Sequence, residues 1–85
     1  MKYFIGEICE VNGGMEYSSR YLFATNGNAL RYSNKVVKDW RGSASEEFDK
    51  NLEGYWSGCT LICNGGFDEI SEADFVVLKK YLAVL

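Results

Sequence analysis

The sequence predicts an α+β fold, in which an antiparallel sheet of about four to five strands carries two helices on one face, in the order ββα-ββα. Three observations lead to this prediction. Asn12-Gly13-Gly14 separates two segments in which apolar and polar residues alternate, as in a hairpin. Residues 29–41 and 71–85 instead space their apolar side chains as helices do. Short hairpin connections favour an antiparallel sheet with both helices on the same side.

Residues 2–11 and 15–25 are predicted to form the first hairpin. If its loop has two residues, alternate side chains fall into two sets on opposite faces; a loop one residue longer would regroup them. The face with Phe4, Gly6 and Ile8 is the better candidate for the core. It also carries Tyr17, Ser19, Tyr21 and Phe23, whereas the other face carries Tyr3, Ile5, Glu7 and Cys9 opposite Leu22, Arg20, Ser18 and Glu16.

A helix is predicted over residues 29–41, with Asn28 as its N-cap and Gly42 just beyond its last turn. Its two sides differ in chemistry, as in an amphipathic surface helix. The side expected to face the sheet carries Ala29, Tyr32, Val36, Val37 and Trp40, and the opposite side carries the basic stripe Arg31, Lys35, Lys38 and Arg41.

A polar, acidic connection follows in residues 43–54. It is expected to hold either a helical turn, because Ser43 and Glu46 fit a capping box, or a short strand around Phe48. Both structures remain open from the sequence.

Residues 55–64 are predicted to be one strand, after which Asn64-Gly65-Gly66 turns the chain into a short return strand over 67–70. This prediction places alternate residues on one face. They are Tyr55, Ser57, Cys59, Leu61 and Cys63.

The last helix has the clearest start signals. Ser71 is a suitable N-cap, and the acidic Glu72 and Asp74 suit the positive end of the helix dipole. The apolar residues of this segment are expected to form a buried helical stripe. They are Phe75, Leu78, Leu82 and Leu85.

Length and composition limit the possible functions. The 85 residues fit a single domain, 1–85, and contain no histidine, the commonest general base and metal ligand. Because no nucleophile-elbow or phosphate-binding motif is present either, we expect no enzyme and no cofactor. No apolar stretch reaches the roughly 20 residues that cross a bilayer, and no signal-peptide core follows Met1, so we expect a cytoplasmic protein.

The three cysteines are an odd number and too few for a disulfide framework. They are also too few for a structural zinc site, which needs four ligands. On one strand, Cys59 and Cys63 would lie about 13 Å apart, beyond the reach of a disulfide. We expect reduced, largely buried thiols, with a bridge from Cys9 to Cys59 or Cys63 as a minor alternative.

The charge distribution is uneven. Residues 43–74 carry eight acidic side chains and one basic one, although the whole chain has a net charge of only −3. An acidic segment beside surplus aromatic residues predicts a surface that docks on a basic protein. The predicted partner-binding residues are Glu46, Glu47, Asp49, Glu53, Tyr55, Trp56, Asp68 and Glu69.

In size, charge and lack of catalytic residues, the chain is similar to small inhibitors of phages and mobile elements, of which anti-CRISPR proteins are one group. This similarity implies a module that masks a basic, nucleic-acid-binding surface of a larger protein or ribonucleoprotein complex. Two alternatives remain open. One is direct nucleic-acid binding by the basic stripe, which the acidic segment disfavours. The other is a homodimer or small-ligand carrier, because helices on one side leave the other sheet face uncovered.

Overall fold

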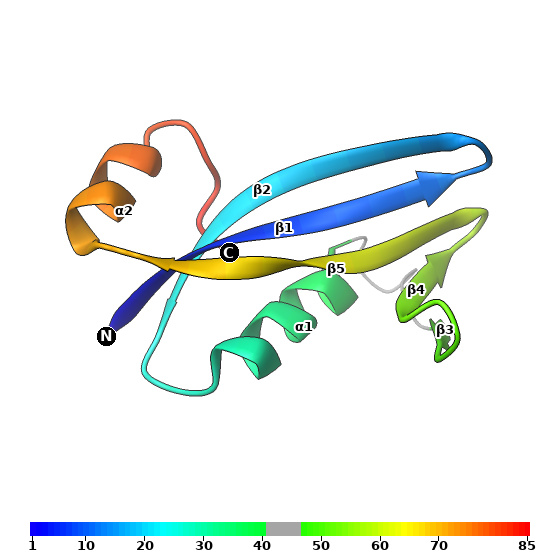
Figure 1. Cartoon of the computed structure of the whole chain (residues 1–85), viewed down its shortest axis with the longest axis horizontal. Helices are drawn as coiled ribbons and strands as arrows, with labels where there is room; N and C mark the ends of the chain where they lie inside the picture. The colour runs from blue at the N-terminus through cyan, green and yellow to red at the C-terminus, as the bar shows by residue number, and fades with distance from the viewer. Residues whose placement is uncertain (41–46) are drawn as a thin grey trace.

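Five antiparallel strands form one sheet, in the order β2-β1-β5-β4-β3, and two helices pack on it (Figure 1). The computed structural model describes residues 1–40 and 47–85. The predicted α+β class is confirmed, with the element order ββαβββα. The elements are β1 (Lys2–Asn12), β2 (Met15–Thr25), α1 (Ala29–Asp39), β3 (Glu47–Asp49), β4 (Gly54–Ser57), β5 (Thr60–Ile70) and α2 (Glu72–Leu78).

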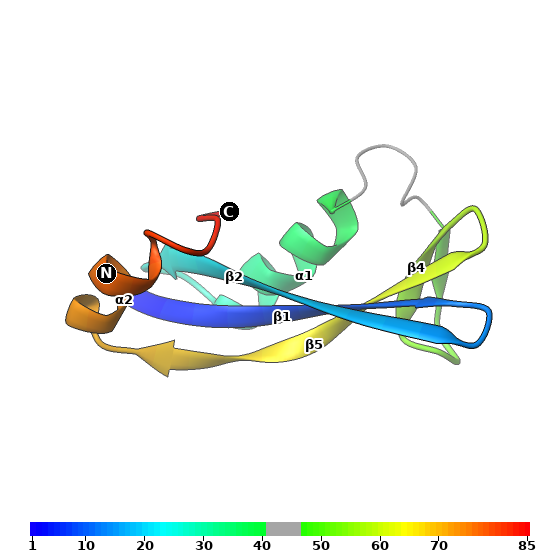
Figure 2. The same ribbon diagram turned by 90° about the horizontal axis from the view of Figure 1, so that it is seen from above.

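The first hairpin has the predicted register. Its loop is Gly13-Gly14, Asn12 lies opposite Met15, and Gly13 has a φ of 61°, which favours glycine. The Phe4 face therefore belongs to the core, as predicted. Figure 2 shows the strong twist of the three long strands.

The core lies between the Phe4 face and α1. The buried side chains of this core cluster are Phe4, Ile8, Tyr21, Phe23, Val37 and Ile62. Asn28 is the N-cap of α1, as predicted, and its Oδ1 accepts a hydrogen bond of 3.0 Å from Arg31 N. At the other end of the helix, Trp40 Nε1 donates to Glu10 Oε1 over 3.0 Å. Gly42, the predicted terminator, lies outside the described residues.

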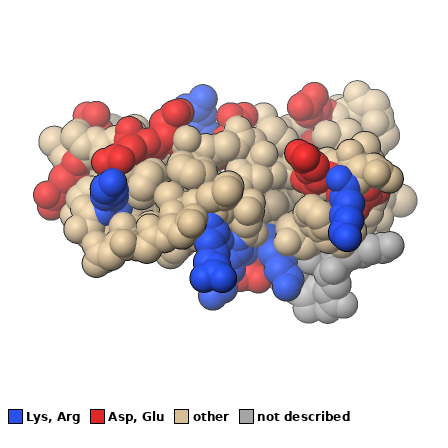
Figure 3. Space-filling view, turned by 60° about the horizontal axis from the view of Figure 1, so that its bottom comes forward, with Lys and Arg blue, Asp and Glu red and all other residues tan. Residues whose placement is uncertain are grey.

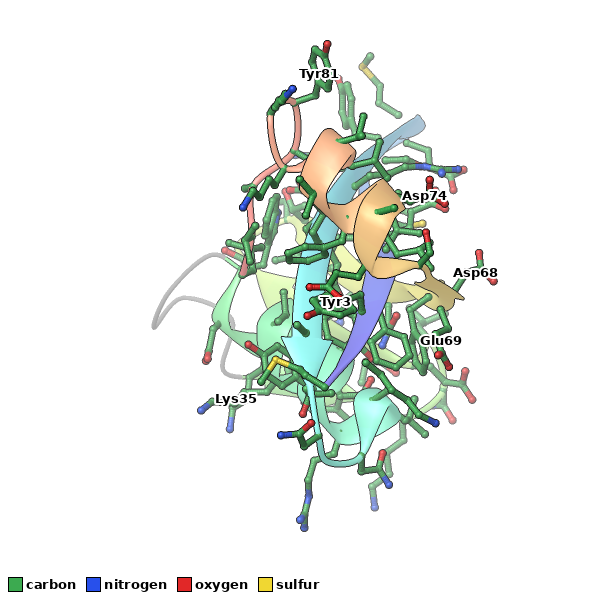
Figure 4. All side chains as sticks on the ribbon, turned by 90° about the vertical axis from the view of Figure 1, so that its left-hand side faces the viewer. Tyr3, Lys35, Asp68, Glu69, Asp74 and Tyr81 are labelled. Atoms are coloured by element: carbon green, nitrogen blue, oxygen red, sulfur yellow. The ribbon has the colours of Figure 1, made fainter. Side chains whose placement is uncertain are left out.

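The second helix packs on the opposite face from α1, and the prediction of both helices on one face is wrong. The Phe75 ring of α2 contacts the Tyr3 ring, with 4.9 Å between their centroids (Figure 4 shows Tyr3 beneath α2). Tyr3 precedes Phe4 on β1, so the two side chains point to opposite faces. An amphipathic pattern shows that a helix has a buried side, but it does not show which face of a sheet that side covers.

The helix α2 also ends earlier than predicted. Leu82 and Leu85 lie beyond it, in a C-terminal segment that runs along the outer edge of β2. Leu22 N donates to Ala83 O and Leu85 N donates to Leu22 O, each over 2.8 Å. The predicted helical stripe is therefore divided between α2 and an extended segment, and Leu85 remains exposed.

Two further predictions for the second half are wrong. The turn occurs at Gly58-Cys59, where Gly58 has a φ of 60°, so residues 55–64 belong to two strands. Tyr55 consequently shares a face with Ile62, and Leu61 lies on the other face.

Asn64-Gly65-Gly66 is a bulge within β5, where Gly66 has a φ of 99° and Asn64 Oδ1 accepts from Gly66 N over 2.8 Å. The same residues suit a turn and a bulge, because both need positive φ. The short return strand predicted over 67–70 is therefore the continuation of β5.

The acidic connection contains β3, which confirms the alternative of a short strand around Phe48. The Ser43–Glu46 capping box lies outside the described residues. The three cysteines are free, with Cys9 and Cys63 directly opposite each other on β1 and β5 and Cys59 exposed in the Gly58-Cys59 turn. Within residues 1–40 and 47–85, neither helix has the length and apolar character to cross a membrane.

Candidate protein-binding surface

The predicted partner-binding residues do not form one patch. Asp49 and Glu53 flank the connection between β3 and β4, whereas Asp68 and Glu69 lie at the far end of β5, next to α2 (Figure 1). The long axis of the molecule measures 38 Å, and these two groups lie towards its opposite ends. Glu46 lies outside the described residues, and Glu47 begins β3. The sequence did not predict the separation because it did not predict that β5 continues through its glycines.

Asp49 uses its carboxylate to hold its own turn. Oδ1 accepts from the backbone N of Asn51 at 2.9 Å and of Leu52 at 3.1 Å, and Oδ2 accepts from Trp56 Nε1 at 3.3 Å. The hydrogen bond from Leu52, followed by that from Trp56, lowers the pKa of Asp49. These bonds assign Asp49 and Trp56 a structural role at this end of the molecule.

Tyr55 and Trp56 lie on opposite faces of β4, so they cannot act together on one flat partner surface. Tyr55 lies on the α1 face, where its ring contacts Phe48 with 5.0 Å between centroids. Both tyrosine and tryptophan are half-buried.

An open groove of about 600 Å³ separates α1 from β3 and β4, with β5 along its side. Apolar side chains dominate its lining, and two of them are strongly exposed: Leu30 (57%) and Phe48 (49%). Val37, Tyr55 and Phe67 complete the apolar lining. Sequence reasoning missed this groove, although Leu30 signals it as a large apolar residue outside the predicted buried side of α1.

The other acidic group is larger than predicted. Asp68 and Glu69 are exposed, and the equally exposed Glu72 and Asp74 follow them in α2. Figure 4 shows Asp68, Glu69 and Asp74 on the same side of this end of the molecule. Partial burial and the nearby Glu72 carboxylate raise the pKa of Tyr3, which lies beneath the helix.

The basic stripe is exposed along α1, as predicted, for Arg31, Lys35 and Lys38; Arg41 lies outside the described residues. Figure 3 shows basic side chains along the α1 side and acidic side chains towards both ends. A second groove of about 430 Å³ lies beside this helix, lined by Tyr32, Trp40 and Leu85 among others. The separation is incomplete, because Figure 3 also shows basic side chains beside the acidic ones at both ends.

Among the described residues, no group of three or more cysteine or acidic side chains is arranged to hold a metal ion. Comparisons with protein-family models, with curated proteins and with solved structures found no match.

Proposed function

We propose that this chain is a small, non-enzymatic protein-binding domain that masks a basic, nucleic-acid-binding surface of a larger cytoplasmic protein or ribonucleoprotein complex, in the manner of phage or mobile-element inhibitors such as anti-CRISPR proteins. One observation carries the proposal: the exposed carboxylate of Glu69 lies on the same face of β5 as Phe67, which lines the apolar groove, while the exposed Asp68 lies between them on the opposite face. An apolar contact region with charged residues at its rim is typical of protein interfaces.

The acidic residues would speed encounter and orient the partner, and the apolar groove would supply most of the contact energy. The chain would therefore compete with nucleic acid, because both would bind the same basic surface of the partner. Asp49 does not belong in this interface, since its carboxylate already holds the β3–β4 connection.

The test is a pull-down from nuclease-treated lysate at low and high salt, with bound proteins identified by mass spectrometry. The test variant reverses Asp68 and Glu69 to lysine, and the matched control reverses Glu16 and Asp39, which are also exposed. We expect a stoichiometric, salt-sensitive partner whose affinity falls about tenfold or more in the test variant only. Recovery of the chain alone would remove the masking proposal and favour a homodimer or a ligand carrier.

The exposed stripe on α1 supports a second candidate, direct nucleic-acid binding. Replacement of Arg31, Lys35 and Lys38 by alanine should then abolish binding to a generic oligonucleotide at low salt. If the intact protein binds no oligonucleotide under that condition, this candidate is excluded.

A further inference from the structure

Within residues 1–40 and 47–85, the outer edge of β5 is open beyond its bulge. β4 pairs only with Thr60–Cys63, and β5 continues to Ile70. Among the described residues, no other strand pairs with the outer side of 64–70. Gly65 and Gly66 are exposed, and nothing lies within 4 Å of where a Cβ on Gly66 would be. A strand edge of this kind can accept an additional strand.

The direction of the backbone groups on this edge follows from the opposite side of the sheet. Leu22 bonds outward, to Ala83 and Leu85, so it does not exchange hydrogen bonds with Ile5, its partner on β1. Opposed residues in an antiparallel pair alternate between exchanging both bonds and exchanging none. Ile5 therefore directs its N–H and C=O towards β5, where it lies opposite Asp68.

The backbone N–H and C=O groups of successive strand residues point to alternate sides of the strand, so those of the two neighbours of Asp68 point away from β1. The N–H and C=O groups of Phe67 and Glu69 point away from β1, towards the open side. No register shift interrupts this part of the β1–β5 ladder, since the bulge lies between Glu7 and Ile8. The edge thus presents two residues with outward donors and acceptors.

The groove lies beside this edge. A strand added in line with β4 would place alternate side chains on the α1 face, next to Leu30, Phe48, Tyr55 and Phe67. The groove thus provides an apolar site for at least one side chain of the added strand, on the same face as the Phe67 ring.

The charge of this region distinguishes between two occupants. Asp68 and Glu69 lie on the edge, and Glu72 and Asp74 follow them. A second copy paired along the same edge would bring these carboxylates together, which is unfavourable. A basic segment would instead pair with them.

We propose that the edge of β5 from Gly65 to Ile70 binds an extended segment of the partner as a sixth strand, with an apolar side chain in the groove and lysine or arginine residues on the opposite face, beside Asp68. This inference rests on the proposed function and specifies how the partner is held. Main-chain bonds to Phe67 and Glu69 would fix the segment, and its alternating apolar and basic residues would give specificity.

The first test is an NMR titration of the ¹⁵N-labelled protein at low salt with the synthetic peptide KVKLKVK, capped at both ends. The control peptide EVELEVE has glutamate in place of lysine. We expect the amide resonances of Phe67 and Glu69 to shift with KVKLKVK and their hydrogen exchange to slow by about tenfold, while the amide of Asp68, which points towards β1, remains protected. Shifts confined to other surfaces, or no binding at millimolar KVKLKVK, would overturn the proposal.

The second test separates backbone pairing from charge. Glu69→Pro removes the outward N–H, which an edge strand tolerates, whereas Glu69→Gln removes only the charge. We expect Glu69→Pro to weaken KVKLKVK binding at least about fivefold more than Glu69→Gln. Equal affinities of the two variants would exclude main-chain pairing. If Glu69→Pro fails to fold, slower amide hydrogen exchange at Phe67 and Glu69 of the unaltered protein with KVKLKVK supports main-chain pairing, and unchanged exchange excludes it.

The two proposals fail in different ways. A salt-sensitive partner that binds Glu69→Pro and Glu69→Gln equally would leave the masking function intact and overturn strand addition. Binding of KVKLKVK at the edge without any salt-sensitive partner in the lysate would overturn the masking function. Shifts of Phe67 and Glu69 that depend on protein concentration, without peptide, would assign the edge to a second copy and overturn the proposed occupant.

Discussion

Gly6 of β1 lies directly opposite Tyr21 of β2, and the Tyr21 ring occupies the space that a side chain at position 6 would need. A Cβ on Gly6 would lie 2.7 Å from Tyr21 Oη, closer than van der Waals contact allows. The ring is fully buried and stacks on Phe23, with 5.7 Å between centroids. The glycine thus allows a large aromatic side chain to lie across β1 in the core.

Gly6→Ala is therefore expected to destabilise the protein. The added methyl group must displace a fully buried ring, and such overpacking costs about 1–3 kcal/mol of unfolding free energy. Urea denaturation measures the loss, with Gly14→Ala as the control, since nothing lies within 4 Å of a Cβ there. Equal stabilities of the two variants would show that the Tyr21 ring can move to accommodate the methyl group without loss of stability.

Tyr21 also makes the stability of the protein depend on pH in the alkaline range. Its buried hydroxyl has no hydrogen-bond partner among the described residues, and burial, with a smaller effect of Tyr32, raises its pKa from 10.0 to about 12. The hydroxyl loses its proton at a lower pH in the unfolded chain than in the folded one. The free energy of unfolding therefore keeps its full value below pH 10 and falls as the pH rises towards 12. The loss is on the order of 2 kcal/mol.

Tyr21→Phe should remove this part of the pH dependence and leave stability at neutral pH equal or higher, by up to about 1 kcal/mol. Urea denaturation above and below pH 10 measures both effects. Tyr17→Phe, at a position that is 53% exposed, is the matched control and should keep the unaltered protein's profile. An identical alkaline profile for Tyr21→Phe would contradict the role of the buried hydroxyl.

Asp49 should make the β3–β4 connection sensitive to acid. The hydrogen bonds from Leu52 and Trp56 lower its pKa below 3.8, so its contribution to stability is present above that pH and disappears as the pH falls through the lowered value. The indole N–H resonance of Trp56, followed by NMR, should move in that range. Asp49→Ala should shift it at neutral pH already, whereas Asp39→Asn, on an exposed residue of α1, should not.

The cysteines should differ in reactivity. Cys59 is exposed in its turn, whereas burial, followed by the neighbouring Cys9, raises the pKa of Cys63 and reduces its thiolate fraction. We expect iodoacetamide at neutral pH to alkylate Cys59 about tenfold faster than Cys63, as measured by peptide mass spectrometry. In Cys59→Ser the fast phase should be missing, and its persistence would contradict this assignment.

Local sequence signals determined much of the first half of the chain. Asn12-Gly13-Gly14 predicted the hairpin, and with the two-residue loop that the structure has, alternation places the face with Phe4 and Tyr21 in the core. Asn28 and Ser71 likewise identified the starts of both helices, because an N-cap side chain satisfies backbone donors a few residues away. These features depend on neighbours in sequence or on a single turn.

The second Asn-Gly-Gly shows where local signals become ambiguous. Glycines at 65 and 66 permit either a turn or a bulge, and pairing of both flanking segments with β1 selects the bulge. The choice decides the candidate site: with β5 continuous, Asp68 and Glu69 lie far from Asp49, and no strand of the described residues pairs with the edge beyond Asn64.

The sequence by itself determined the α+β class, the position of the first hairpin turn, the buried side of α1 and the exposure of its basic stripe, because short-range steric and capping effects control them. Only the tertiary structure decided that α2 covers the face opposite α1, that the acidic residues divide between two ends, and that β5 presents an open edge beside an apolar groove. Those features depend on which distant segments pair. The choice among alternative pairings is decided by the packing of the whole chain, and no short segment contains that information.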